Sequence, residues 1–189
     1  MATVYFVRHA EANYHNYDDV RRELTEQGLR DRALVTDYLS DKGIDAVFSS
    51  PYRRAIETVR PLSETCGLPV QIVPDFRERR ISGSWIEDFD KFSRRQWEDF
   101  SYKLPGGESL AEVQRRNVDA LFAILEGHPD QRLVIGSHGT ALSTVIRYFD
   151  ETFGYEEFVK IKKLMPWIVR FTFAGNQLRD IKLIDVFRR

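Results

Sequence analysis

The sequence predicts an α/β domain of three layers, in which helices cover both faces of a mainly parallel sheet. Short apolar runs alternate along the chain with longer segments of helical periodicity, an order typical of parallel strands joined by helices. The chain has 189 residues, of which 42 % are hydrophobic. This is enough for one core, so we expect a single domain over residues 1–189.

Four apolar runs are expected to be strands buried on both faces, as a sheet covered by helices requires. They are residues 4–7, 46–48, 70–73 and 133–135. Near the end of the chain, WIVRFTFAGNQLRDIKLIDV predicts a C-terminal antiparallel hairpin that turns at residues 174–176.

Helix starts are predicted from capping residues that precede periodic apolar segments. These signals are Thr25, Ser50 followed by Pro51, the pair Ser109 and Glu112 with capping-box spacing, and Gly139-Thr140. Gly43 is expected to end the helix that begins after Thr25.

The segment 75–103 interrupts this alternation with dense mixed charge and interspersed aromatic residues. We expect an insertion that acts as a lid or specificity element. The alternative is a pair of solvated helices packed on their aromatic side chains, and both descriptions can hold. Cationic candidates for a second anionic group of a substrate are Arg79, Arg80, Lys91, Arg94 and Arg95. The aromatic residues Trp85, Phe89, Phe92 and Trp97 either stack on a substrate or form a small core.

Charge and composition argue against several classes of partner. The formal charge is −1 with 30 % charged residues, whereas nucleic-acid and anionic-membrane binders usually carry a basic excess. The single cysteine, Cys66, allows no internal disulfide and no multi-cysteine zinc site. No leader and no apolar run near ~20 residues is apparent, so we expect a cytoplasmic protein. The terminal hairpin offers an edge for a homodimer, but nothing in the sequence selects it.

Charged and polar groups follow each of the four predicted parallel strands. They are Arg8-His9, residues 49–54, Glu78, and residues 137–139. The carboxyl ends of parallel strands line a common crevice in which ligands bind, so we expect these groups to converge. Each has an ordinary explanation when taken alone, as a polar loop histidine, a surface arginine, or a glutamate paired with Arg77, Arg79 or Arg80.

Together these groups predict a site for a tetrahedral oxyanion. Arginine forks match phosphate oxygens, and helix N-termini, such as those near Arg54 and Gly139, favour anions. A carboxyl group beside a phosphoester suits proton donation to the leaving oxygen. An imidazole directed at phosphorus can act as the nucleophile.

Six motifs in one order resemble the histidine phosphatase superfamily, in its phosphoglycerate mutase-like branch. They are VYFVRHAE (4–11), LTEQG (24–28), FSSPYRRAIET (48–58), FRERRISGSW (76–85), PGGESLAEVQRR (105–116) and VIGSHGTAL (134–142). The resemblance covers nearly the whole chain.

The resemblance implies that His9 is the nucleophile and becomes phosphorylated. Arg8 and Arg54 would hold the phosphoryl oxygens, with His138 as the second imidazole of the pocket. Glu78 would be the general acid and then the base that activates water. The implied partner is a small phosphorylated metabolite, and the reaction needs no metal and no cofactor.

The sequence departs from the family pattern in the first motif and after it. Ala10 stands where glycine is usual, and His15 stands where many members have asparagine, with Asn16 next to it. Either of these two residues is a candidate donor to a phosphate oxygen. The following region lacks the phenylalanine-threonine-glycine-tryptophan stretch of glycolytic mutases, which favours a phosphatase over a mutase. A third hypothesis is a phosphate-binding or regulatory protein without turnover.

Overall fold

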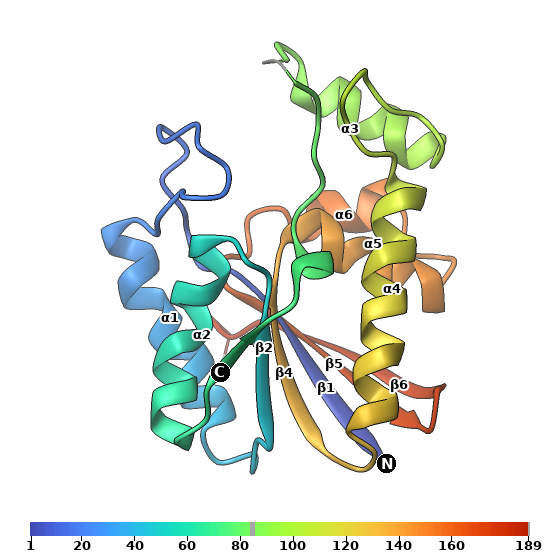
Figure 1. The fold of residues 1–189 in the computed structure, drawn as a ribbon. Helices are drawn as coiled ribbons and strands as arrows, with labels where there is room; N and C mark the ends of the chain where they lie inside the picture. The colour runs from blue at the N-terminus through green and yellow to red at the C-terminus, as the bar shows by residue number, and fades with distance from the viewer. Residues whose placement is uncertain (84–85, 189) are drawn as a thin grey trace.

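The computed structural model describes residues 1–83 and 86–188, and it confirms the predicted fold class. One six-stranded sheet has the order β3-β2-β4-β1-β5-β6 (Figure 1). The parallel strands are β1 (Ala2–Arg8), β2 (Ala46–Ser49), β3 (Val70–Ile72) and β4 (Arg132–Ser137). The predicted hairpin is β5 (Trp167–Ala174) and β6 (Gln177–Ile184), and β5 pairs antiparallel with β1.

Helices cover both faces of this sheet, as Figure 1 shows. One face carries α1 (Glu26–Leu39) and α2 (Arg53–Cys66), which share a core with alternate sheet residues such as Tyr5 and Val7. The other face carries α4 (Leu110–Gly127), α5 (Gly139–Phe149) and α6 (Tyr155–Ile161), packed on residues such as Val4 and Phe6. Burial on both faces explains the continuous apolar runs in the sequence.

Capping residues set most helix boundaries where the sequence predicts them. The Thr25 side chain accepts a hydrogen bond from the Gly28 N–H, and Ser109 and Glu112 form the capping box of α4. Two predicted boundaries are wrong. The first helix ends at Leu39, before Gly43, and α2 begins at Arg53 with Tyr52 as its N-cap. Ser50 and Pro51 form the turn before α2.

The third predicted strand is not buried on both faces. β3 lies at the edge of the sheet and pairs with β2 alone. Ile72 is 46 % exposed as a result. The apolar composition of β3 did not reveal its edge position, because an edge strand and a central strand can contain the same β-branched residues.

The segment 75–103 is an excursion above the carboxyl ends of the parallel strands (Figure 1). Its described residues contain the end of a 3₁₀ turn, η1 (Pro74–Phe76), and one helix, α3 (Phe89–Glu98), so the predicted pair of helices is wrong. Phe92 and Trp97 are buried, and Trp97 packs on Phe158 of α6. The small-core interpretation is thus confirmed for these two aromatic residues. Trp85 lies outside the described residues.

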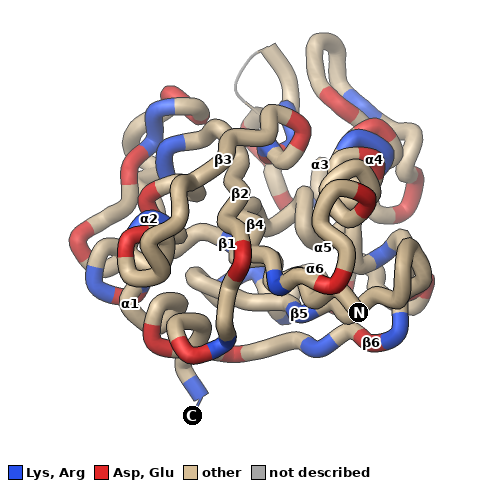
Figure 2. Tube along the Cα trace, turned by 60° about the horizontal axis from the view of Figure 1, so that its bottom comes forward, with Lys and Arg blue, Asp and Glu red and all other residues tan. Residues whose placement is uncertain are grey.

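Charges of both signs are interspersed over the helices and loops, as Figure 2 shows. Within residues 1–83 and 86–188, no helix has the length and apolarity needed to cross a membrane.

Candidate active site

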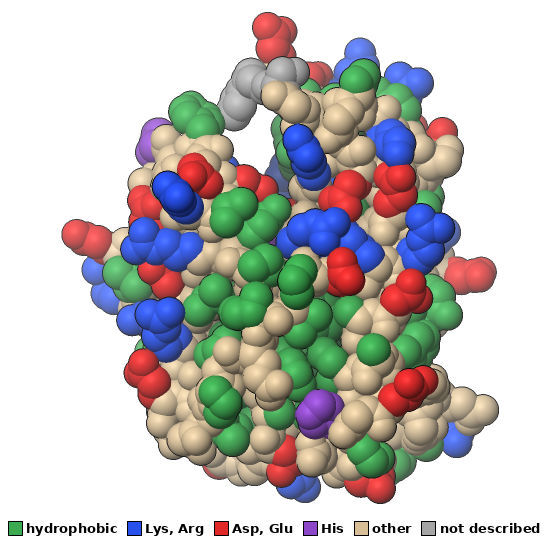
Figure 3. Space-filling view, viewed as in Figure 1, with side chains coloured by type: hydrophobic (Ala, Val, Ile, Leu, Met, Phe, Trp, Pro, Cys, Tyr) green, Lys and Arg blue, Asp and Glu red, His purple; other side chains and the backbone are tan. Residues whose placement is uncertain are grey.

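The charged groups that follow the parallel strands meet around one open cavity of about 1570 Å³. Figure 3 shows the molecule hollowed at this end, between two lobes. The predicted residues on the cavity wall are Arg8, His9, Arg54, Glu78 and Gly139. His138 lies directly behind His9, with the two ring centroids 5.4 Å apart.

His9 is held as a neutral imidazole with a defined tautomer. Its Nδ1 lies 2.7 Å from the carbonyl oxygen of Ala10, so Nδ1 carries the proton and donates it there. The Nε2 lone pair faces Arg54, whose Nε lies 3.2 Å away. Burial, and then the charges of Arg54 and Arg8, hold the pKa of His9 well below its usual value. This imidazole is suited to nucleophilic attack from Nε2.

Arg8 is fixed on one side and free on the other. Its Nη1 donates to the carbonyl oxygens of Ile161, Lys162 and Leu164, at 2.8, 3.0 and 3.2 Å. Its Nε is buried and has no hydrogen-bond partner among the described residues. A Cβ at Gly139 would lie 3.0 Å from this Nε, so only glycine leaves room for the guanidinium. Arg8 lines the cavity, so its guanidinium suits an oxyanion bound there.

Arg54 uses all three of its nitrogen atoms within the protein. Besides the contact with His9, Nη1 donates to the carbonyl oxygen of Asp19 at 2.5 Å, and Nη2 pairs with its Oδ1 at 3.0 Å. Arg54 lies in the first turn of α2, as predicted. Asp19 is a site residue that the sequence analysis missed, and its only signal is a carboxylate in the loop after the first motif.

His138 supports the nucleophile from within the core. Its Nε2 lies 2.7 Å from the Ser50 hydroxyl, and its ring packs edge-on against Tyr52 and His9. Burial, and then the charge of Arg54, hold the pKa of His138 well below its usual value. Its Nδ1 is buried without a hydrogen-bond partner in the described part of the chain.

Glu78 lies at the N-terminus of α5. Its Oε1 accepts from the backbone N–H of Arg79 and of Ala141, at 2.8 and 2.9 Å, and its Oε2 accepts from the N–H of Thr140 at 3.0 Å. Among residues 1–83 and 86–188, no ion pair joins Glu78 to a neighbouring arginine. Arg77 pairs instead with Asp75 and Glu108.

The structure does not bring His15 and Asn16 to the cavity. His15 is exposed, and the Asn16 Nδ2 donates to Glu23 at 2.8 Å. Hydrogen bonds from Asn13 and then Asn16 lower the pKa of Glu23 to about 2. This carboxylate holds the Asn16 amide, so the prediction that either residue contacts phosphate receives no support. The loop instead lines the cavity with Tyr14, Tyr17, Asp19, Val20 and Arg22.

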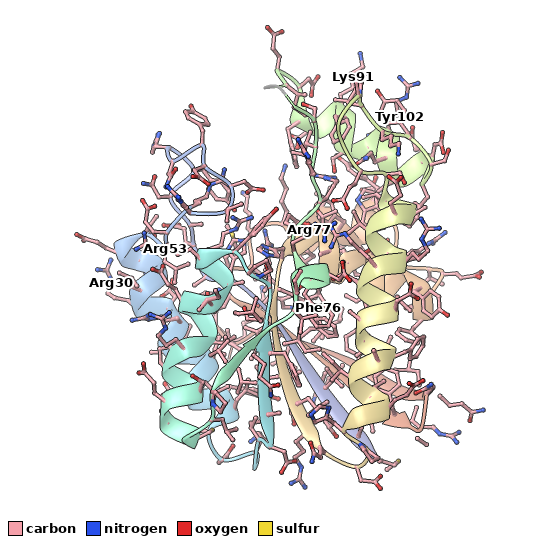
Figure 4. The ribbon with its side chains drawn as sticks, viewed as in Figure 1. Arg30, Arg53, Phe76, Arg77, Lys91 and Tyr102 are labelled. Atoms are coloured by element: carbon pink, nitrogen blue, oxygen red, sulfur yellow. The ribbon has the colours of Figure 1, made fainter. Side chains whose placement is uncertain are left out.

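Of the five cations proposed for a second anionic group, only Arg79 and Arg80 line the cavity. Arg79 is 4 % exposed, lies over the Phe89 and Phe92 rings, and donates from Nη1 to Gln96 at 2.8 Å. Lys91 lies near the start of α3, at the top of the view in Figure 4. Arg94 lies over the Tyr155 ring, and Arg95 lies over the Tyr102 ring. No group of three or more potential metal-ligating side chains occurs in the described ranges.

Comparison with known proteins assigns the family. The model of the histidine phosphatase superfamily (branch 1) matches residues 4–180. A metal-independent phosphoserine phosphatase of Arabidopsis thaliana is 29 % identical over 157 residues, which cover 75 % of this chain and 66 % of that protein. The probable phosphoglycerate mutase GpmB of Yersinia pestis (strain Pestoides F) is 28 % identical over 158 residues, covering 77 % and 74 %.

A solved structure agrees on the fold. Phosphoserine phosphatase from Entamoeba histolytica, in complex with 3-phosphoglyceric acid, has a TM-score of 0.76 at 20 % identity, covering 98 % of this chain and 99 % of that chain. The chain belongs to the histidine phosphatase superfamily. Its curated relatives include both a phosphatase and a probable phosphoglycerate mutase.

Proposed function

We propose that this protein hydrolyses phosphomonoesters of small phosphorylated metabolites, without a metal, through a phosphohistidine at His9. The observation that carries the proposal is the state of the His9 ring. Its Nδ1 proton is donated to the Ala10 carbonyl, its Nε2 lone pair faces Arg54, and its pKa is held well below the usual value by burial.

In the first step the Nε2 lone pair forms a bond to phosphorus while the bond between phosphorus and the leaving oxygen breaks. Glu78 gives its proton to that oxygen. Arg8, and Arg54 once phosphate has displaced the Asp19 carboxylate, hold the phosphoryl oxygens and stabilise the charge of the transition state.

In the second step water attacks phosphorus and the bond between phosphorus and Nε2 breaks. Glu78 takes a proton from that water, which returns the carboxyl to its starting state. His138 packs against the His9 ring and keeps its orientation in both steps.

Hydrolysis is favoured over mutase-type transfer because the cavity is open at one end, as Figure 3 shows, so water has access to the intermediate. A mutase retains its product until the phosphoryl group has been returned, which suits a closed pocket. The binding-only alternative is disfavoured because all five expected positions, Arg8, His9, Arg54, Glu78 and His138, are filled.

The test is phosphate release from a panel of phosphomonoesters in the presence of a metal chelator, for the wild type and His9→Ala. Phosphorylated hydroxy acids and amino acids head the panel because the relatives act on or bind such compounds. We expect chelator-resistant activity that disappears in the variant. Activity that survives in His9→Ala refutes the proposal, and transfer from bisphosphoglycerate to monophosphoglycerate without net hydrolysis favours the mutase.

A further inference from the structure

The motif PGGESLAEVQRR (105–116) contributes no group to the steps described above, yet it lies against the segment that carries Glu78. This segment, residues 77–83, belongs to no helix or strand. It therefore lacks the backbone ladder that would fix its position, and its shape depends on contacts from neighbouring elements. Figure 4 shows Arg77 next to the upper part of α4, on the side where these contacts are made.

Arg116 of α4 supplies several of these contacts. Its Nη1 donates to the carbonyl oxygens of Asp75 and Arg77 at 2.6 and 2.7 Å, and its Nη2 donates to the carbonyl oxygen of Glu78 at 3.2 Å. A planar guanidinium presents its donors in a rigid fork. One side chain thus fixes the backbone up to and including Glu78.

Glu108 completes the support on the other side of Glu78. Its carboxylate accepts a two-pronged pair from Arg116, with Nε to Oε1 at 2.8 Å and Nη2 to Oε2 at 3.0 Å. The same carboxylate accepts from the Arg80 N–H at 2.9 Å, and the Glu108 N–H donates to the Arg80 carbonyl at 2.7 Å. Glu78 is thereby held between two anchored positions.

The glycines of the motif permit this approach. A Cβ at Gly107 would lie 2.0 Å from the carbonyl oxygen of Ile81, so no other residue allows the two backbones to lie so close. Gly106 has φ +74, in the left-handed region that favours glycine. Ser109 then starts α4 at once, and Arg116 follows two turns along the helix.

From this anchored backbone the Glu78 side chain reaches the first N–H groups of α5. Among the described residues, no hydrogen bond joins Arg116 or Glu108 to Arg8, His9 or Arg54. The support of Glu78 is thus separate from the hydrogen bonds of the phosphate-binding side chains.

We propose that Arg116 and Glu108 are positioning residues, which hold the Glu78 carboxyl where it can protonate the leaving oxygen. The inference rests on the proposed function, because it presupposes that Glu78 is the general acid. It predicts a loss that depends on how much protonation the leaving group needs. A nitrophenolate leaves without a proton, whereas an unsubstituted phenolate gains much more from one.

The experiment compares kcat/KM for phenyl phosphate and para-nitrophenyl phosphate in the wild type and in Arg116→Gln, because this ratio reports the steps up to departure of the leaving group. We expect a loss of about 100-fold on phenyl phosphate and less than about threefold on para-nitrophenyl phosphate. Inhibition by inorganic phosphate should be unchanged. The matched control is Arg115→Gln, since Arg115 is exposed on the adjacent position of α4, and it should behave as the wild type.

Two further variants keep the outcomes distinct. Glu108→Gln removes the charged pair with Arg116 but keeps the size of the side chain. We expect it to lose about tenfold in kcat/KM on phenyl phosphate, with a much smaller loss on para-nitrophenyl phosphate. This variant keeps the test informative where Arg116→Gln folds poorly. Glu78→Gln is the reference for loss of the acid. If Glu78→Gln shows no dependence on the leaving group, the proposed acid is wrong. If it does, and both support variants lose activity equally on the two esters or lose phosphate binding, the role of Arg116 and Glu108 is structural and the inference is overturned.

Discussion

Asp19 pairs with the Arg54 guanidinium, which the proposed reaction needs for binding phosphate. Removing the negative charge of Asp19 should therefore strengthen anion binding at Arg54. The Asp19 carboxylate and carbonyl engage Nη2 and Nη1 of Arg54, while Nε faces His9. An incoming phosphate must therefore displace the carboxylate before Arg54 can bind it in a forked geometry. Asp19→Asn keeps the size of the side chain and removes the competing charge.

The magnitude follows from the exposure of the two side chains. The Arg54 side chain is 3 % exposed and that of Asp19 is 43 % exposed, so solvent screens the pair in part. A charged hydrogen bond of this kind contributes about 1 kcal/mol after that discount, which corresponds to about fivefold in affinity. We expect the inhibition constant of inorganic phosphate to fall by about fivefold in Asp19→Asn.

The assay is inhibition of ester hydrolysis by inorganic phosphate at constant ionic strength. Asp31→Asn is the control because it makes the same change in net charge. Asp31 is a half-buried residue of α1, and its side chain bonds only to Gln27 among the described side chains. Weaker phosphate binding in Asp19→Asn would mean that Asp19 orients Arg54 for the ligand, and the reasoning from competition would then be refuted.

Three further predictions concern the packing and the pH dependence of the site. Gly139→Ala places a Cβ 3.0 Å from the Arg8 Nε, so we expect kcat/KM to fall by about tenfold or more through displacement of the guanidinium; an unchanged kinetic profile would contradict the packing argument. Gly28→Ala places a Cβ 2.1 Å from the Glu11 carbonyl oxygen and should lower the free energy of unfolding by about 1–3 kcal/mol in urea denaturation, with Gly127→Ala, whose Cβ meets nothing within 4 Å, as the comparison. Burial and Arg54 depress the pKa of His9 and His138 in the folded protein. Below about pH 6.5 these two side chains therefore bind protons in the unfolded chain but not in the folded protein. The free energy of unfolding should then fall on acidification by about 1.4 kcal/mol per pH unit for each histidine. Urea titrations between about pH 6.5 and about pH 5.5 should show a smaller slope in His138→Gln than in the wild type, and equal slopes in the two proteins would refute this.

The strand ends were the most informative part of the sequence. Arg8 and Ser137 are the last residues of β1 and β4, which the sequence shows as continuous apolar runs, and His9 and His138 come next in the chain. The parallel direction of the two strands brings all four residues to one edge of the sheet. Apolar runs and helical periodicity predicted the layers, and the direction of parallel strands then predicted this edge. The apolar pattern misplaced β3 because hydrophobicity does not tell an edge strand from a central one.

The residues that the sequence analysis missed or misplaced depend on contacts between distant loops. Asp19 meets Arg54 through a fold of the loop that has no periodic signal. Ser50 was predicted to cap a helix, but its hydroxyl forms a hydrogen bond with His138, and α2 begins only at Arg53. The Asn16 amide donates to Glu23 and does not line the cavity. Such competition among hydrogen-bond partners becomes visible only when the three-dimensional arrangement is known.

The position of β1 in the sheet determines when the protein can fold during its synthesis. Thr3 lies between Arg132 of β4 and Thr172 of β5, so the strand that ends in the nucleophile pairs with segments far along the chain. During synthesis this apolar strand leaves the ribosome long before either neighbour exists. It must stay unpaired, and exposed to aggregation or to chaperones, until β4 and β5 have emerged. Catalytic activity should therefore appear abruptly and late in translation, with no active intermediate of shorter length.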